Sequence, residues 1–173
     1  FRNDLYENWD KLKILGRVYI AHEGINAQLS IPEYNWQCFK KQVERKKELK
    51  SVPIKHALHN GLSFFKLTIK VRKELVAYGL SLDHYDMQKK GKYLSAKEYN
   101  KAIDEPNSIV VDMRNYYESE IGRFENALIP NVDTSKELLP KVKQLLQNKK
   151  EKKILLYCTG GIRCEKASSF LIK

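Results

Sequence analysis

A short apolar run that ends in a cysteine and two glycines constrains the fold of this chain more than any other feature. Residues Ile154–Tyr157 are apolar, the charged residues 149–153 precede them, and Cys158 follows directly. An apolar run bounded in this way predicts a buried strand. Helical spacing of apolar residues resumes from Arg163. We therefore expect a strand, a tight loop over residues 158–162 and a helix, in that order.

This arrangement predicts a reactive thiol at Cys158. The backbone N–H groups of a tight loop before a helix can converge on an anion. Gly160 and Gly161 supply the backbone freedom that such a loop needs. A free cysteine has a pKa of about 8.5, which a helix N-terminus or a nearby cation lowers. Arg163 adds a permanent cation. We interpret Cys158 as a nucleophile; the alternative is a small, inert core residue.

The spacing between cysteine and arginine separates two kinds of chemistry. Protein tyrosine phosphatases place five residues between these side chains and wrap the loop around a phosphate. Four residues separate Cys158 from Arg163, namely Thr159, Gly160, Gly161 and Ile162. The shorter loop favours a sulfur-sized group over phosphate.

A second motif lies upstream, where Ser108 and the apolar residues 109–111 lead into Asp112, Arg114 and Glu118. Asn115 and Glu118 have the spacing of a capping box, in which Glu118 reaches back to the start of a short helix. Arg114 and Glu118 have the spacing of an ion pair if Arg114 joins that helical turn. We interpret Asp112, Arg114 and Glu118 as a scaffold for the cysteine loop rather than as catalytic groups.

Both motifs resemble those of rhodanese domains, and the amino-terminal half narrows the resemblance. Residues 16–29 (GRVYIAHEGINAQL) and 158–167 (CTGGIRCEKA) closely resemble the bacterial tRNA uridine hydroxylase family. The resemblance covers nearly the whole chain. It implies an N-terminal ferredoxin-like (acylphosphatase-like) α+β sandwich followed by a rhodanese-like α/β domain. It also implies truncation at both ends, with a strand expected before Phe1 and a last strand and helix after Lys173.

The domain boundaries follow from a change in pattern. Residues 78–93 mix glycine, aspartate and lysine without a sustained apolar period, which indicates a linker. Ser95 and Glu98 then form a capping box that starts a helix. We therefore expect a ferredoxin-like domain over residues 1–77, a linker over 78–93 and an incomplete rhodanese-like catalytic domain over 94–173.

The first domain is expected to contain strands over residues 17–21 and around 27–31, a helix over 33–50, and a strand over 63–72. The last strand would turn Phe65, Leu67, Ile69 and Val71 inward. In the second domain we expect strands near Ile109 and Leu155. A longer helix should start at Pro140, because proline clashes inside a helix that begins earlier.

The net charge of +11 indicates an acidic partner or general solubility. Basic residues of the predicted helix and strand in the first domain are expected to bind RNA phosphates, whereas the alternative is an ordinary solvated surface. Those that we single out are Lys46, Lys47, Lys66, Lys70 and Arg72.

Because the loop containing His22, Glu23 and Asn26 lies in the family motif, we expect it to face the cysteine loop or the RNA; an ordinary turn is the alternative.

Three cysteines are an odd and sparse set, which favours the reducing cytoplasm over a secreted disulfide framework. The absence of a run of about 18 apolar residues predicts no membrane span. No cysteine or histidine cluster has zinc-ligand spacing, so no metal site is predicted. The resemblance implies molecular oxygen as a co-substrate and reveals no cofactor. The oligomeric state stays open.

The resemblance implies an oxidoreductase that hydroxylates C5 of the wobble uridine in the anticodon loop of tRNA. Cys158 would either add to C6 of the uracil or carry a persulfide. One alternative is a rhodanese-type sulfurtransferase with a persulfide on Cys158, and another is a non-catalytic RNA-binding module. Cys164 is either a resolving thiol for an oxidised Cys158 or a packing residue of the helix.

Overall fold

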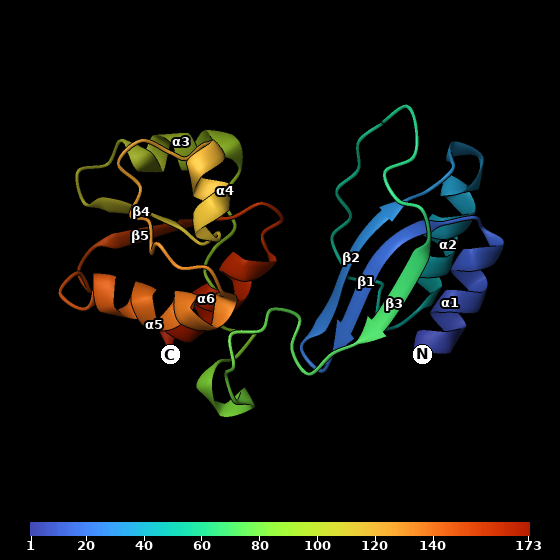
Figure 1. Ribbon diagram of the computed structural model, residues 1–173, viewed down its shortest axis with the longest axis horizontal. Coiled ribbons are helices and arrows are strands. Elements are labelled where there is room, and N and C mark those ends of the chain that lie inside the picture. The colour runs from blue at the N-terminus through green and yellow to red at the C-terminus, as the bar shows by residue number, and fades with distance from the viewer. The chain divides into compact units, whose positions relative to one another are not determined.

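Two helices cover one face of a three-stranded sheet in the first unit of the chain, Phe1–Leu75 (Figure 1). The computed structural model describes residues 1–173, except for the side chain of Leu82. Along the chain the elements of the first unit are α1 (Arg2–Lys11), β1 (Leu15–Ala21), β2 (Gly24–Ser30), the 3-10 turn η1 (Glu33–Asn35), α2 (Trp36–Arg45) and β3 (Leu67–Val71). The sheet has the order β2-β1-β3, with β1 antiparallel to β2 and parallel to β3.

The core of the first unit forms where the two helices meet the sheet. Leu5 and Trp9 lie four residues apart on α1, and Phe39 and Val43 have the same spacing on α2, so each pair shares one helix face. All four are buried against Val18, Leu67 and Ile69 of the sheet. Burying each such side chain contributes roughly 1.5–3 kcal/mol.

Two predictions for the first unit are corrected by the structure. The helix expected over residues 33–50 ends at Arg45, because Lys46 takes an extended conformation with φ −89° and ψ 118°. Lys46 and Lys47 therefore follow the helix instead of lying on it. The strand expected over 63–72 begins only at Leu67, so Phe65 precedes it and is 96% exposed, while Val71 at its end is 67% exposed.

The second unit, Val76–Lys173, has two parallel strands between two layers of helices. Figure 1 shows α3 (Ala96–Ile103) and α4 (Tyr116–Ile121) on one side of the strands and α5 (Ser135–Leu146) and α6 (Ile162–Ile172) on the other. The strands β4 (Ser108–Asp112) and β5 (Lys153–Tyr157) pair in register, with Asp112 beside Tyr157. Because the strands are parallel, the two sequence motifs begin at the same end of the sheet.

The segment predicted as a linker, residues 78–93, packs on α6. It includes one 3-10 turn, η2 (Leu82–His84). Tyr78 and Tyr85 are buried, and the buried Lys166 of α6 donates from Nζ to the carbonyl of Val76 at 3.1 Å. The Lys166 Nζ also lies 4.8 Å from the centre of the Tyr85 ring. These contacts attach the segment to the second unit.

The longer helix α5 does not start at Pro140, as the sequence predicted, but at Ser135. Pro140 lies inside the helix, where a proline costs about 3 kcal/mol. The side chain of Glu137 accepts from the backbone N–H and the hydroxyl of Thr134, at 3.2 and 2.7 Å, in a capping box. Leu138, Leu139 and Val142 are fully buried around the proline. Their burial together outweighs the cost of the proline, at roughly 1.5–3 kcal/mol for each side chain.

No helix among the described residues is both long enough and apolar enough to span a bilayer.

Candidate active site

Cys158 directly follows β5, and its sulfur accepts a hydrogen bond from the loop that it begins. The backbone N–H of Gly161 donates to the Sγ atom at 3.1 Å. Cys164 follows in the first turn of α6. Gly161 has a left-handed conformation, with φ +96°, which side chains resist. The loop therefore needs this glycine to fold its donors around the sulfur.

The surroundings of Cys158 lower its pKa from the ordinary value to about 5. The largest cause is the hydrogen bond from the Cys164 thiol, while burial opposes the shift. The backbone N–H groups of Cys164 and Gly161 and the charge of Arg163 lower the pKa further. Cys158 is thus a thiolate at neutral pH, the form in which cysteine acts as a nucleophile.

The pKa of Cys164 moves in the opposite direction. It is raised because its thiol donates to the Cys158 sulfur and because the residue is largely buried. The first proton of the pair is therefore lost from Cys158, and the second proton stays on Cys164.

Glu118 of α4 holds the cysteine loop from outside. Its carboxylate accepts from both terminal nitrogens of Arg163, at 2.6 and 2.8 Å, and from the Thr159 hydroxyl at 2.9 Å. It also accepts the backbone N–H of Asn115 at 3.1 Å, as the capping prediction requires of Glu118. The hydrogen bonds from Arg163, opposed by burial and helped by Asn115 and Thr159, lower the pKa of Glu118 to about 2. The ionised Glu118 carboxylate thereby fixes α4 to the loop.

Asp112 is the centre of a second polar cluster, at the end of β4. The carboxylate is fully buried and accepts from Arg114 Nε at 2.9 Å, from the Ser119 hydroxyl at 2.9 Å and from the Tyr157 hydroxyl at 2.6 Å. Burial opposes ionisation, but the hydrogen bonds from Arg114, Tyr157 and Ser119 outweigh it and lower the pKa of Asp112. The cluster links β4, α4 and the last residue before Cys158.

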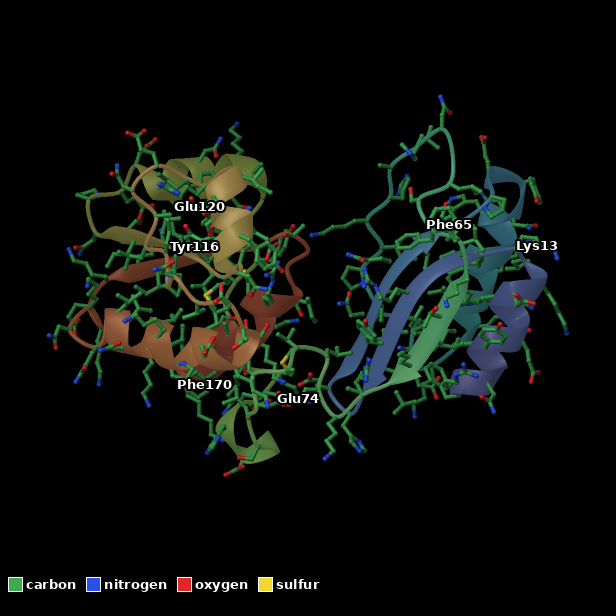
Figure 2. All side chains as sticks on the ribbon, viewed as in Figure 1. Lys13, Phe65, Glu74, Tyr116, Glu120 and Phe170 are labelled. Atoms are coloured by element: carbon green, nitrogen blue, oxygen red, sulfur yellow. The ribbon has the colours of Figure 1, made fainter. Side chains whose placement is uncertain are left out.

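The ion pair foreseen between Arg114 and Glu118 does not form. Arg114 precedes α4, which begins at Tyr116, so the two side chains do not share a helical turn. Arg114 pairs instead with Asp112 at 2.8 Å, and Glu118 pairs with Arg163. α4 thus serves both clusters, through Ser119 on one side and Glu118 on the other; Figure 2 labels Tyr116 and Glu120 on this helix.

Three polar residues of this region escaped the sequence analysis. Tyr157 and Ser119 bind Asp112, and the Tyr78 hydroxyl donates to the carbonyl of Arg163 at 3.1 Å. A tyrosine at the end of an otherwise aliphatic strand was the available signal for Tyr157. The sequence around Tyr78 gave no such signal, because this residue lies in a segment without an apolar period.

The outer side of the cysteine loop is open. A Cβ atom built on Gly160 or Gly161 would meet no other atom within 4 Å. A substrate group can therefore approach the loop without displacing a side chain at these positions.

The candidate RNA-binding residues lie in the first unit and have differing surroundings. Lys46 is paired with the carboxylate of Asp4, and the guanidinium of Arg72 lies 5.4 Å from the centre of the Tyr19 ring. Lys47, Lys66 and Lys70 are exposed.

The hairpin between β1 and β2 carries the other candidates of the first unit. His22 is exposed and Asn26 is half-buried. The carboxylate of Glu23 accepts the backbone N–H of Leu75 at the end of the unit. Glu23 therefore has a structural role in the chain that leaves β3.

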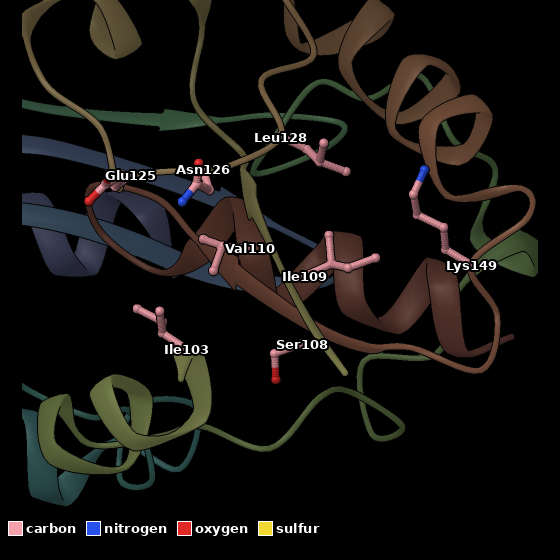
Figure 3. Close-up of a pocket in the computed structure, with 8 residues that line it drawn as sticks. All are labelled: Ile103, Ser108, Ile109, Val110, Glu125, Asn126, Leu128 and Lys149. Atoms are coloured by element: carbon pink, nitrogen blue, oxygen red, sulfur yellow. The ribbon is translucent and has the colours of Figure 1, made fainter. Parts of the chain in front are cut away.

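A cavity of about 270 Å³ lies elsewhere in the second unit (Figure 3). Its walls include Ser108 at the amino end of β4, Ile103 of α3 and Lys149. Cys158 follows the carboxyl end of β5, so the cavity is not part of the cysteine site. Among the side chains that the structure describes, no three histidine, cysteine, aspartate or glutamate residues are grouped as metal ligands.

Comparison with known proteins identifies both units. Residues 1–75 match the family described as "UPF0176 acylphosphatase like domain", and residues 95–173 match "Rhodanese-like domain". These matches confirm the predicted fold classes.

Similar proteins named "tRNA uridine(34) hydroxylase" include one from Leptospira interrogans, 52% identical over 98% of this chain, and one from Photorhabdus laumondii, 47% identical over 99%. A third, from Escherichia coli strain SE11, is 46% identical over 98%. The aligned regions cover 47%, 49% and 49% of these relatives, so the chain spans about half of their length. The chain therefore carries a match to a UPF0176 acylphosphatase-like domain followed by a match to a rhodanese-like domain.

Proposed function

We propose that this chain supplies the reacting cysteine for hydroxylation of a uridine in tRNA. The relatives that cover nearly all of the chain carry the name tRNA uridine(34) hydroxylase. The observation that supports the proposal most strongly is the Cys158 sulfur, which accepts the backbone N–H of Gly161 at 3.1 Å and has a pKa lowered to about 5. The loop thus holds a thiolate, and its outer side is open.

The chemistry begins with addition of the Cys158 thiolate to C6 of the uracil ring. The new Sγ–C6 bond moves the C5–C6 π electrons toward C5, which becomes electron-rich enough to attack molecular oxygen. A reductant from outside the chain supplies two electrons and, with two protons, releases one oxygen atom as water. Loss of the C5 proton and expulsion of the thiolate then leave 5-hydroxyuridine. The low pKa of Cys158 favours both the attacking thiolate and its later departure.

The substrate must present an unstacked base, because C6 is inaccessible within a stacked helix. The anticodon loop of tRNA offers such a base at the wobble position. Phosphates of the same RNA are complementary to the basic residues of the first unit. The exposed Lys47, Lys66 and Lys70 would bind them electrostatically. These reactions and partners fit a cytoplasmic protein.

Sulfur transfer with a persulfide on Cys158 is the second candidate, favoured by the match of residues 95–173 to the rhodanese-like domain. Cys164, which packs against the same apolar cluster as Cys158, argues against it. A thiol next to a persulfide attacks it, which forms a disulfide and releases hydrogen sulfide. A non-catalytic RNA-binding module needs no thiolate, so the donors around Cys158 weigh against that third function.

Nucleoside mass spectrometry distinguishes these functions. The full-length protein, as wild type or Cys158→Ser, is expressed in cells that lack it, and their tRNA is digested. We expect 5-hydroxyuridine with the wild type and none with Cys158→Ser. A thiolated uridine that depends on Cys158 would favour sulfur transfer. Hydroxylation by a folded Cys158→Ser protein would exclude Cys158 as the nucleophile.

A further inference from the structure

The sheet of the first unit has one face that its two helices do not cover. α1 and α2 pack on the other face, where Val18 of β1 and Ile69 of β3 are buried (Figure 1). Side chains alternate between the two faces along a strand. Arg17 and Tyr19 flank Val18, so both point away from the helices. Lys70 follows Ile69 and points the same way. Arg17 and Lys70 are exposed, so this face is open to solvent.

Tyr19 lies at the centre of the open face, because β1 is the middle strand. The register pairs Tyr19 with Asn26 of β2 on one side and with Lys70 of β3 on the other. The neighbouring row places Arg17 beside Gln28 of β2. Residues that are paired across neighbouring strands point to the same face. The half-buried Tyr19 ring therefore has amides on its β2 side and a cation on its β3 side.

Arg72 extends the cationic side past the end of β3. Its backbone N–H donates to the carbonyl of Ile20 at 2.8 Å, which continues the pairing with β1. Its guanidinium lies 5.4 Å from the centre of the Tyr19 ring. Within the three strands as the structure describes them, no residue is an aspartate or glutamate. The strands add no negative charge to the open face, which is complementary to phosphate groups.

The side chains of this face suit the parts of an unpaired nucleotide. Aromatic rings and guanidinium planes stack on RNA bases that are not held in a helix. The amides of asparagine and glutamine both donate and accept hydrogen bonds, so they can bind the edges of such bases. The cations bind backbone phosphates. Paired RNA keeps its bases stacked inside the helix, so a ring at the centre of the face favours an unpaired nucleotide as the partner.

We propose that this face binds unpaired nucleotides of the tRNA anticodon loop, with one base stacked on the Tyr19 ring. We call it the Tyr19 face; its members are Arg17, Tyr19, Asn26, Gln28, Lys70 and Arg72. The inference rests on the proposed function in taking tRNA as the substrate. The anticodon loop is the source of the nucleotides because its bases are unpaired and the proposed reaction requires this loop to be held.

The test is binding of a fluorescently labelled anticodon stem-loop RNA to the full chain, measured by fluorescence anisotropy over a range of salt concentrations. Wild type, Tyr19→Ala and Tyr19→Phe are compared. Loss of the stacking ring in Tyr19→Ala should weaken binding about 5- to 150-fold. The salt dependence should not change, because Tyr19 carries no charge. Tyr19→Phe keeps the ring and should retain most of the wild-type affinity.

The cations of the Tyr19 face should give a different signature. Arg17→Gln should make the dependence of log affinity on log salt shallower by about 0.7, the contribution of one phosphate in a single strand. Lys41→Gln is the matched control and should keep the wild-type slope, because Lys41 is exposed on α2 in the layer behind the sheet. Tyr34→Ala is the control for the ring and should bind as wild type does, since Tyr34 is 79% exposed in η1, outside the sheet.

Circular dichroism checks that each variant is folded. Tyr19→Leu keeps a bulky side chain in β1 without a ring, so it replaces Tyr19→Ala if that variant unfolds, with the same expected loss. Unchanged affinity in the folded variant that lacks the ring would overturn the inference. Equal losses in Tyr19→Phe and Tyr19→Ala would also overturn it. So would an equal loss of binding to a blunt-ended RNA duplex, because the ring would then not recognise an unpaired base.

The binding assay requires no turnover, so its outcome is separate from that of the proposed function. Protein that shows the expected losses but makes no hydroxylated uridine would retain the Tyr19 face and exclude the proposed reaction. Hydroxylation that depends on Cys158, together with unchanged stem-loop binding by Tyr19→Ala, would retain the reaction and overturn the inference.

Discussion

Glu118 accepts two hydrogen bonds from Arg163, of 2.6 and 2.8 Å, and this pair connects α4 to the loop around Cys158. The two side chains are 22% and 17% exposed, so solvent screens the interaction only in part. Forty-five positions in the sequence separate them. The pair therefore stabilises a tertiary arrangement rather than one helix.

Replacing Glu118 by alanine should destabilise the protein by about 1–3 kcal/mol, because Arg163 and Thr159 lose their acceptor. The measurement is urea unfolding of the full chain. Glu120→Ala is the matched control on the same helix: Glu120 forms a 3.4 Å pair with Arg123, and both side chains are about half exposed. Such a pair contributes about 0.2–1 kcal/mol. Equal losses in the two variants would contradict the account.

The pH dependence of stability provides a second test of Glu118. Its pKa is lowered from 4.5 to about 2, so the folded state favours the ionised form. The resulting stability is complete above pH 4.5 and is lost as the pH falls toward 2. Glu118→Gln should therefore flatten the fall in unfolding free energy over this range relative to wild type. An identical pH profile in Glu118→Gln would show that the carboxylate is not held in this way.

Asp112→Asn should cost more than Glu118→Ala, about 3–5 kcal/mol, because Arg114 then lacks a charged partner beside a fully buried group. Tyr157→Phe removes one hydrogen bond to the same carboxylate and should cost about 0.5–1.5 kcal/mol, or up to about 3 because the acceptor is charged. Thermal and urea unfolding measure both. A larger loss in Tyr157→Phe than in Asp112→Asn would show that Asp112 is not the centre of this cluster.

Binding of tRNA should weaken when Lys47, Lys66 and Lys70 are replaced by glutamate, because these exposed amines can neutralise phosphates. The dependence of binding on salt should also become shallower, by about 0.7–0.9 for each phosphate that the variant no longer neutralises. The control changes the net charge equally at the exposed Lys97, Lys101 and Lys141 of the second unit. Equal weakening in both triple variants would mean that only net charge matters.

The sequence predicts the parts of the site that depend on local pattern. The strand before Cys158, the glycine loop and the Glu118 capping interaction all follow from neighbouring residues, and each has its counterpart in the structure. The Arg163–Glu118 pair could not be predicted in this way, because it depends on how α4 packs beside the loop. The role of Cys164 likewise depends on loop curvature, so the sequence left it open between resolving and packing.

Errors in the predicted elements arose where packing outweighs local preference. Pro140 lies within α5 because the buried residues around it stabilise more than the proline costs. Phe65 continues the alternation of Leu67 and Ile69, yet it precedes β3 and is exposed. Periodicity identifies the face of a strand but does not determine where the strand begins.

Titration of the Cys158 thiol tests the central claim most directly. The thiolate absorbs in the ultraviolet, and subtracting the spectrum of Cys158→Ser from that of wild type across pH isolates this sulfur. The account predicts an inflection near pH 5, so that the thiolate is the resting form at neutral pH. An inflection near the free cysteine value of about 8.5 would show that the loop does not stabilise the thiolate and would contradict the account.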